Sequence, residues 1–322
     1  MTRRSEVPPP VTAVLDASST WLPTRLAEVE ELLAAQMTGH GERLEAAGKE
    51  TLAAGGKRLR PMLVLLCAGP EAGEAEVRAA TAVELVHMAT LVHDDVLDAA
   101  PLRRGKPTVV ATSGREMAVA AGDLLFSRAF ALLAEAGDAS GVALLADASV
   151  ALARGELAQR ADAFDTAIAE ERYMERCRLK TGALFRCACL LGRRESQPLR
   201  EFGEGIGLAF QLLDDVLDVA GPPERTGKAR GTDLLDGTVT LPLILAAERD
   251  PGILDTDLRR LDAAAAEALC DRIAASGSLD EVRSRALEMV AGAKRGLHDP
   301  GLAPEQRRLL ELVADGVVER YG

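Results

Sequence analysis

The chain has 322 residues, of which 48% are hydrophobic, 27% are charged and only 3% are aromatic, and its formal net charge is −12. A chain of this length can form one large domain or two smaller ones with a substantial core, and the composition is that of an ordinary globular protein. The negative charge argues against binding to nucleic acid through a general basic field.

Helical periodicity extends along almost the whole chain. Apolar residues recur at three and four positions, and the breaks coincide with Gly, Pro or Ser clusters. Residues 1–10 predict a disordered tail, and no Pro/Gly/Ser-rich linker divides residues 11–322, which we interpret as one domain. In chain order, the predicted helices cover 23–37, 42–53, 59–68, 74–98, 114–136, 139–161, 169–191, 198–219, 238–249, 256–276, 279–297 and 303–320. No segment alternates convincingly with period two, so the sequence predicts an all-α, single-domain helical bundle.

The sequence shows no sign of export or of membrane insertion. Arg3 and Arg4 are followed by prolines, and the longest apolar runs are far shorter than the ~20 residues of a spanning helix. The five cysteines form no CxxC pair, which is typical of buried free thiols in a reducing compartment. We therefore expect a cytoplasmic protein without a transmembrane segment.

A basic segment, GGKRLRP at 55–61, comes just before the predicted helix 59–68. Gly55 and Gly56 free the backbone at a helix N-terminus, where phosphate is favoured. Lys57, Arg58 and Arg60 add positive charge there. Taken alone, the segment is better explained as a solvated turn.

The predicted helix 74–98 ends in an acidic pentad, DDVLD. Asp94 and Asp98 are four residues apart and share a helix face, with Asp95 about 100° around the axis. Like charges at this spacing cost a helix about 0.2–0.5 kcal/mol per pair. Pro101 predicts the end of the helix, which places three carboxylates at the negative end of its dipole. The flanking sequence, ELVHMATLVH, is too apolar for an exposed acidic helix.

The same pentad recurs as Asp214, Asp215 and Asp218 at the end of the predicted helix 198–219, just before a Gly-Pro-Pro break. A divalent cation would remove the penalty at both helix ends, and this many carboxylate oxygens suits Mg²⁺ or Ca²⁺. The spacing is not that of an EF-hand loop. Magnesium commonly uses one or two carboxylates and completes its shell with water and substrate phosphates.

Each pentad is followed by a basic loop. The first loop carries Arg103, Arg104 and Lys106, and the second carries Arg225, Lys228 and Arg230. Cations beside a metal cluster in an acidic protein imply an anion held between them, and a diphosphate fits. In this context, GGKRLRP indicates a second diphosphate site.

Other candidate motifs have simpler explanations. The chain has no GxxxxGK[ST] phosphate loop, and Gly203, Gly205 and Gly207 lie inside a helical pattern, where close helix packing explains them better than a dinucleotide fingerprint. His93, beside Asp94, is either a packed residue or a support for the pentad.

Several segments together resemble trans-isoprenyl (polyprenyl) diphosphate synthases over roughly residues 45–250. The matching segments are GGKRLRP (55–61), HMATLVHDDVLDAAPLRRGKPT (87–108), KTG (180–182), FQLLDDVLD (210–218) and GKARGTDLLDGTVTLP (227–242). The resemblance implies a bundle of long helices around a deep central cavity, usually in a dimer. It also implies prenyl transfer, in which isopentenyl diphosphate condenses head to tail onto an allylic diphosphate primer.

The resemblance assigns roles to residues of both pentads and of the basic segments. Three Mg²⁺ ions would be bound by Asp94, Asp98 and Asp214, supported by Asp95, Asp215 and Asp218. The allylic diphosphate would be held by Arg103, Lys180 and Lys228. Isopentenyl diphosphate would be held by Gly56, Lys57, Arg60, His87 and Arg104. Thr181 and Gln211 would lie along the path of the allylic cation.

Small residues before the first pentad predict a long product. Short-chain members of the family commonly place a bulky ring one turn before the pentad, whereas this chain has Thr90 and Ala89 there, followed by Val86, Val83 and Ala82. The helix from Asp94 to Val83 is ~16 Å long and carries no large plug. Phe126 and Phe130 either set a floor lower down or belong to the ordinary core. We therefore expect a C30–C50 product suited to a quinone side chain.

Alternative interpretations differ in product and in assembly. A geranylgeranyl (C20) diphosphate synthase would share every motif, whereas a class I terpene cyclase normally keeps only the first acidic motif in this form. We expect a homodimer, and the chain could also be the catalytic subunit of a heterodimer with a small partner.

Overall fold

The computed structural model describes residues 9–103, 105–221, 230–298 and 301–319. Most of the predicted tail, 1–10, lies outside these ranges, and the first helix, α1 (Pro9–Ala17), begins within it. The periodicity did not predict this helix.

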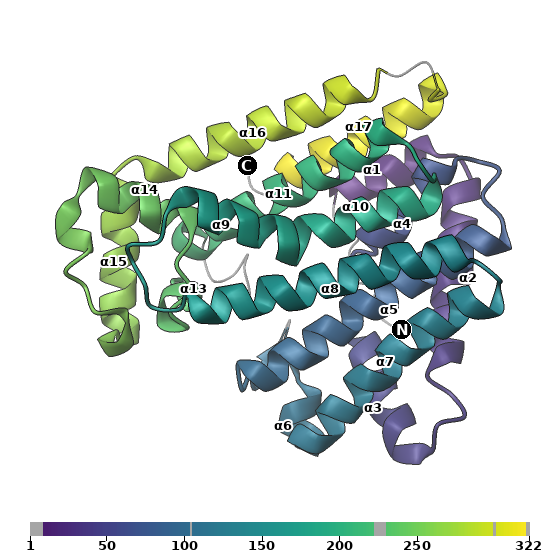
Figure 1. The fold of residues 1–322 in the computed structure, drawn as a ribbon, viewed down its shortest axis with the longest axis horizontal. Coiled ribbons are helices and arrows are strands. Elements are labelled where there is room, and N and C mark those ends of the chain that lie inside the picture. Colours follow the sequence, from purple (N-terminus) through teal and green to yellow (C-terminus); the bar gives the residue numbers. More distant parts are fainter. Residues whose placement is uncertain (1–8, 104, 222–229, 299–300, 320–322) are drawn as a thin grey trace.

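Helices form nearly all of the described chain, as the periodicity predicts (Figure 1). The first half contains α2 (Trp21–Gln36), α3 (Glu42–Ala53), α4 (Leu59–Ala68), α5 (Glu74–Leu97), α6 (Val109–Ser113), α7 (Arg115–Glu135) and α8 (Ala139–Ala161). The second half contains α9 (Glu170–Cys177), α10 (Ala183–Gly192), α11 (Gln197–Ala220), α13 (Thr232–Leu235), α14 (Leu241–Arg249), α15 (Ala263–Ala275), α16 (Ser278–Gly296) and α17 (Pro304–Glu319).

The structure departs from the predicted helices in several places. A two-residue hairpin, β1 (Leu102–Arg103) and β2 (Lys106–Pro107), folds the chain back after α5. The predicted helix 169–191 is interrupted by a π-helical turn, η1 (Arg178–Gly182), between α9 and α10. The predicted helix 256–276 begins with a separate 3₁₀ turn, η3 (Leu258–Arg260), before α15, and another such turn, η2 (Pro251–Ile253), follows α14. Single π turns inside helices are frequently found at functional sites.

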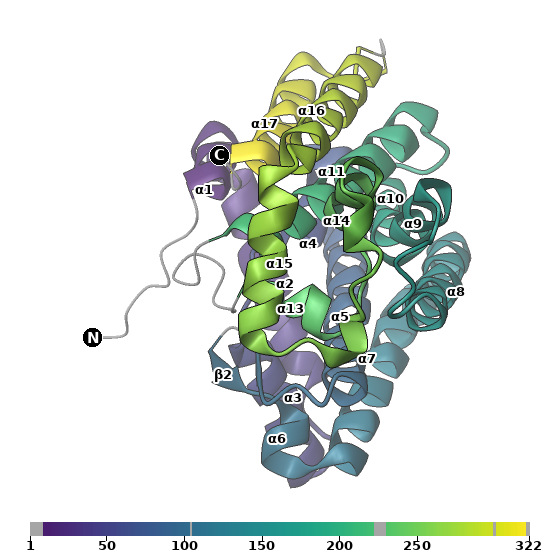
Figure 2. The same ribbon diagram turned by 90° about the vertical axis from the view of Figure 1, so that its left-hand side faces the viewer.

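Helix α5 lies in the centre of the bundle and packs along α7, with α4, α2 and α10 on its other sides. More than half of its residues are buried, among them Val83, Val86 and Ala89. The second long pair is α11 with α16. Figure 2 views the molecule from the end at which α13 and α15 lie. The paired long helices therefore form the frame on which both acidic pentads are placed.

Glycines allow unusually close contact between α10 and α11. A Cβ atom at Gly203 would lie 2.8 Å from the carbonyl oxygen of Phe185, and one at Gly207 would lie 3.1 Å from Cα of Gly182. The first distance is shorter than real Cβ contacts, and the second would require the neighbouring backbone to shift by a few tenths of an ångström. The prediction that these glycines serve helix packing is confirmed.

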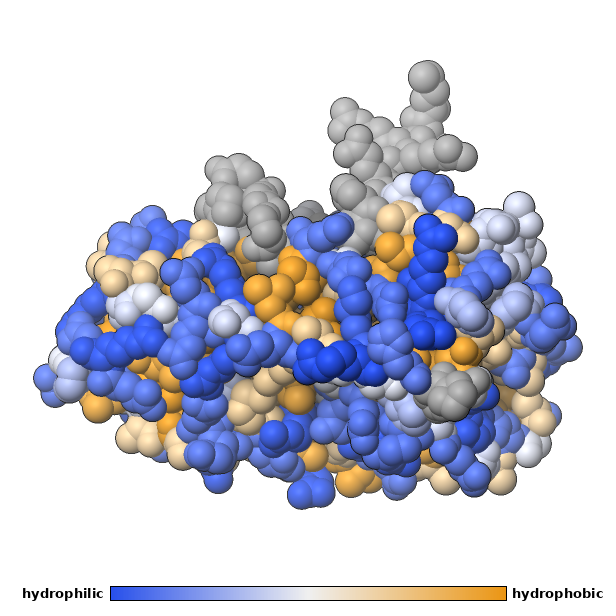
Figure 3. Space-filling view, turned by 90° about the horizontal axis from the view of Figure 1, so that it is seen from above, coloured by the Kyte–Doolittle hydropathy of each residue, from blue (hydrophilic) through white to orange (hydrophobic). Residues whose placement is uncertain are grey.

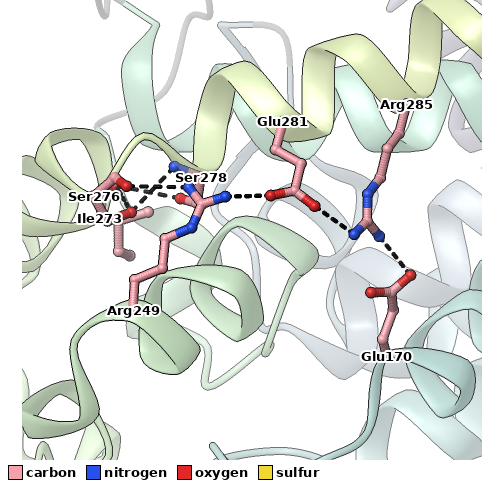
Figure 4. Close-up of polar contacts among 7 residues, drawn as sticks. All are labelled: Glu170, Arg249, Ile273, Ser276, Ser278, Glu281 and Arg285. Atoms are coloured by element: carbon pink, nitrogen blue, oxygen red, sulfur yellow. Dashed lines mark hydrogen bonds and ion pairs between the residues drawn. The ribbon is translucent and has the colours of Figure 1, made fainter.

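The C-terminal helices are tied to α9 by a chain of ion pairs (Figure 4). Arg249 of α14 pairs with Glu281 of α16, and Arg285 lies 2.5 Å from both Glu281 and Glu170, the first residue of α9. Exposed pairs contribute little singly, but a network spanning three helices restrains how they pack. This network fixes the start of the helix that leads into η1.

The hydropathy of the surface and of the helices is that of a bundle with one apolar core. The face above α16 is mostly hydrophilic, with apolar residues in scattered patches (Figure 3). Among the described residues, α7 is the one helix long and apolar enough to cross a membrane, with a mean hydropathy of 1.6 in its best window. Core helices meet the same criterion, and α7 packs along α5.

Candidate functional site

The first pentad lies at the C-terminal end of α5, where the hairpin returns over it. Asp95 is buried, and Nε and Nη2 of Arg103 in β1 each lie 2.8 Å from its Oδ1 atom. Asp98 is the C-cap residue of α5 and is exposed. Asp95 therefore fixes the position of Arg103, while Asp94 and Asp98 lie beside α8.

Two residues of α8 contact this pentad and its surroundings. Nη2 of Arg160 lies 2.5 Å from Oδ1 of Asp98, and Nε of Arg160 donates to Glu156 at 2.9 Å. The other oxygen of Glu156 accepts from Lys180 of η1. Neither Glu156 nor Arg160 was predicted as a site residue. The i,i+4 spacing in the sequence was the only signal, and it is common on helix surfaces.

The surroundings of Asp94 favour a cation. Burial raises the pKa of the Asp94 carboxyl to about 6, opposed by Lys180, and the negative charges of Glu156 and Asp98 raise it further. Among the residues that the structure describes, no group of three His, Cys, Asp or Glu side chains is close enough to hold a metal by itself. Magnesium commonly takes only one or two carboxylates and fills its shell with water and phosphate oxygens. The acidic residues at this helix end therefore fit a metal that arrives with a phosphate-bearing ligand.

The π turn places Lys180 and Thr181 between α8 and α11. Gly155 of α8 makes this possible, because a Cβ atom there would lie only 2.7 Å from the backbone nitrogen of Lys180. Thr181 is buried and its hydroxyl donates to Oε1 of Gln211 at 2.7 Å. The KTG segment thus lies beside Gln211 of α11.

In the second pentad, the middle aspartate faces inward. Asp214 is exposed, whereas Asp215 is buried and accepts from Tyr173 at 2.5 Å and from Nε2 of Gln211 at 2.8 Å. Burial raises the pKa of Asp215 to about 8, with a further contribution from Asp233, while the donors Tyr173 and Gln211 act in the opposite direction. Tyr173 was not predicted as a site residue.

Asp215 and Asp95 therefore have parallel positions. Each is the second residue of its pentad, each is buried, and each is hydrogen-bonded to another predicted site residue, Gln211 or Arg103. The last residue of the second pentad, Asp218, accepts from the backbone of Asp233 at 3.2 Å. The outer aspartates are more accessible: Asp94 is partly exposed, and Asp98 and Asp214 are exposed.

Arg58 anchors the basic segment 55–61 to neighbouring helices. Arg58 has a left-handed backbone (φ 50°), and its guanidinium pairs with Glu84 at 2.9 Å and with Glu30. Gly56 and Lys57 are exposed, and the guanidinium carbon of Arg60 lies 4.5 Å from the centroid of the Phe185 ring. Arg58, which the sequence offered as part of the cationic segment, instead ties that segment to α5.

A shallow pocket, open to solvent, joins this segment to the first pentad. His87, Asp95 and Arg103 line it together with Gly55 and Arg58. The remaining predicted cations, Arg104 and Lys228, lie outside the described residues.

The residues that predict the product length lie on α5, which packs along α7. Thr90 is partly exposed, and its hydroxyl donates to the His87 carbonyl at 2.8 Å, whereas Ala89 is buried. His93 stacks on Phe126 of α7, with ring centroids 5.8 Å apart. His93 is therefore a packed residue in this structure.

Comparisons with known proteins point in one direction. A family model described as polyprenyl synthetase matches residues 41–271. Heptaprenyl diphosphate synthase component 2 of Geobacillus stearothermophilus is 40% identical over 241 residues, which are 72% of this chain and 75% of that protein. A decaprenyl diphosphate synthase structure from Rhodobacter capsulatus matches with a TM-score of 0.88 and 32% identity, covering 97% of this chain and 99% of that one. A polyprenyl synthase structure from Caulobacter crescentus, complexed with calcium and isoprenyl diphosphate, matches with a TM-score of 0.90 and 33% identity, covering 97% and 98%.

Proposed function

The chain belongs to the polyprenyl synthetase family, and from this we propose that it condenses isopentenyl diphosphate head to tail onto an allylic diphosphate and releases a C30–C50 polyprenyl diphosphate. The observation that carries the proposal is the placement of two acidic helix ends around one basic turn, η1. Such a product is suited to a quinone side chain.

The allylic diphosphate would bind between the pentads. Prenyl transfer in this family uses a divalent metal, and we propose three Mg²⁺ ions bound by Asp94, Asp98 and Asp214. When bound, the metal would withdraw charge from the leaving diphosphate. Arg103 and Lys180, with Lys228, would hold the same diphosphate; the contacts of Asp95 with Arg103 support this placement.

The residues around the reacting carbon would act by position and charge. Loss of the diphosphate breaks a carbon–oxygen bond and leaves an allylic cation, and the double bond of isopentenyl diphosphate then forms the new carbon–carbon bond. Thr181 and Gln211 would line the path of this cation, since their side chains are hydrogen-bonded to each other beside η1. The departing diphosphate then accepts a proton from the new cation, which restores a double bond, and the buried setting of Thr181 helps to exclude water.

Isopentenyl diphosphate would bind on the other side of α5. The pocket that His87 lines beside the basic segment supports this site. Gly56, Lys57 and Arg60, with Arg104, would supply its donors. Because Arg58 is committed to Glu84 and Glu30, we assign it no contact with substrate.

The product length can be tested directly. Purified protein with farnesyl diphosphate, isopentenyl diphosphate and Mg²⁺ should yield C30–C50 chains by mass spectrometry, because no aromatic side chain lies one turn before Asp94. Arrest at C15 or C20 would contradict the proposal. Thr90→Phe should shorten the product, because the partly exposed Thr90 has room for a ring. Thr90→Val, which adds no ring, is the matched control and should leave the length unchanged.

The assembly is a separate part of the proposal. We propose a homodimer, and the name of the Geobacillus relative, component 2, suggests a heteromer as the alternative. Gel filtration of the purified chain, with an activity assay across the eluted fractions, distinguishes the two. An active dimer supports the first, and an inactive chain that needs a second protein supports the second.

A further inference from the structure

Four charged side chains from three elements form a chain of alternating sign along α8. Asp98 of α5 contacts Arg160, Arg160 contacts Glu156, and Glu156 contacts Lys180 of η1. The two outer groups are proposed ligand-binding residues, whereas the two α8 residues have no role in the proposed function. The chain therefore links the proposed metal site to the proposed diphosphate site.

The two α8 residues are well placed to form a pair by themselves. Glu156 is N-terminal to Arg160 at a spacing of four, which is the more favourable orientation on a helix. Each carboxylate oxygen of Glu156 contacts a different cation: Oε1 accepts from Nε of Arg160 and Oε2 from Nζ of Lys180. The Glu156 side chain is only 15% exposed, whereas Arg160 is 42% exposed and can move away from Asp98.

Each outer contact occupies a position that a ligand would need. The Arg160 guanidinium lies on an oxygen of Asp98, where a divalent cation would also bind, and two positive charges cannot share that oxygen favourably. In the same way, the Glu156 carboxylate lies on the Lys180 ammonium, where a diphosphate would bind. Both ligands must therefore displace a residue of α8.

We propose, on the basis of the proposed function, that Glu156 and Arg160 form a charge-exchange pair. In the absence of ligands, Glu156 neutralises Lys180 and Arg160 neutralises Asp98, until diphosphate and metal bind. A cation at Asp98 displaces Arg160, which then pairs fully with Glu156. This pairing weakens the ion pair between Glu156 and Lys180, so that the Lys180 ammonium can bind the diphosphate. The device couples the two ligands, so that each makes binding of the other more favourable.

The proposal predicts the sign of a change in binding. Pyrophosphate and Mg²⁺ serve as probes in isothermal titration calorimetry, with the Mg²⁺ midpoint measured at saturating pyrophosphate. Arg160→Gln should lower that midpoint by about 1.4- to 5-fold, the range expected for the loss of one partly exposed ion pair. Arg160→Lys, which keeps the charge, should restore a midpoint close to that of the wild type.

Arg154→Gln is the matched control, because Arg154 is an exposed residue of the same helix and the change removes the same charge. Its midpoint should stay at the wild-type value, and a thermal melt should show each variant folded. Glu156→Gln should tighten pyrophosphate binding at low Mg²⁺, because Lys180 no longer has to leave a carboxylate.

The opposite sign would overturn the proposal. If Arg160 instead bound the diphosphate directly, Arg160→Gln would raise the Mg²⁺ midpoint and weaken pyrophosphate binding. An unchanged midpoint would equally show that Arg160 does not oppose the metal. Failure of the proposed function itself is a different result, in which the wild-type protein binds no pyrophosphate with Mg²⁺.

Discussion

Replacing Gly155 by alanine should damage the reaction far more than the fold. The new Cβ atom would lie 2.7 Å from the backbone nitrogen of Lys180 and 3.0 Å from its Cα atom. Ordinary contacts begin near 3.4 Å, so η1 must retreat by about 0.7 Å. A misplacement of about 1 Å can cost ~10²-fold in rate, so we expect kcat/KM to fall by about 10–100-fold.

The effect on stability should be small because two terms oppose each other. Alanine is favoured over glycine in a helix interior by about 1 kcal/mol, whereas overpacking costs typically about 1–3 kcal/mol. We therefore expect the free energy of unfolding of Gly155→Ala to fall by no more than about 2 kcal/mol. Urea denaturation measures the free energy of unfolding, and incorporation of labelled isopentenyl diphosphate measures kcat/KM.

Gly292→Ala is the matched control in α16. The nearest atom to its new Cβ is Nη2 of the flexible Arg295, at 3.6 Å, so the helix should gain up to about 1 kcal/mol with unchanged activity. If Gly155→Ala behaved like this control, with a similar gain in stability and normal kcat/KM, close contact between α8 and η1 would not position Lys180.

Asp94→Asn should lower kcat/KM by about 10²–10³, because it removes an anionic oxygen from the proposed metal site, and near-normal incorporation of isopentenyl diphosphate would contradict that assignment. Tyr173→Phe should lower the free energy of unfolding by about 1–3 kcal/mol in urea titrations, because a buried oxygen of Asp215 loses its donor; an unchanged midpoint would mean that another group replaces the hydroxyl. Burial raises the pKa of Cys187 to about 12, so the thiol stays protonated near neutral pH, and iodoacetamide should label it only after denaturation; rapid labelling of the native protein would refute this.

Local chemistry predicted most of the helices, because glycine, proline and capping residues mark their ends. Three predicted helices have the observed bounds to the residue: 42–53 is α3, 59–68 is α4 and 139–161 is α8. Apolar spacing could not predict the π turn. The residues that follow it, such as Leu184 and Phe185 of α10, would be apolar after an α-helical turn as well. Its cause is tertiary: it depends on contacts that Gly155 and Gly207 allow.

The sequence points to candidate site residues where the charge pattern violates helix preferences, and less so where partners come from distant elements. The pentads are unfavourable at helix ends, which singled out Asp94 and Asp214 without any structure. Glu156 and Tyr173 are unremarkable helical residues in the sequence, and only the fold brings them to Lys180 and Asp215. The two middle aspartates likewise could not be distinguished from the outer ones by spacing alone.

The π turn also constrains how this chain can vary in length. Five residues occupy η1, where an α-helical path would need one fewer for the same number of turns. Deleting any one of them would restore regular winding and keep α9 and α10 in phase, but it would remove the wide turn in which Lys180 and Thr181 lie. Lys180 could then no longer keep its present position beside α8. Single-residue deletions between 178 and 182 should therefore be far less tolerated than those in the loops that join the helices.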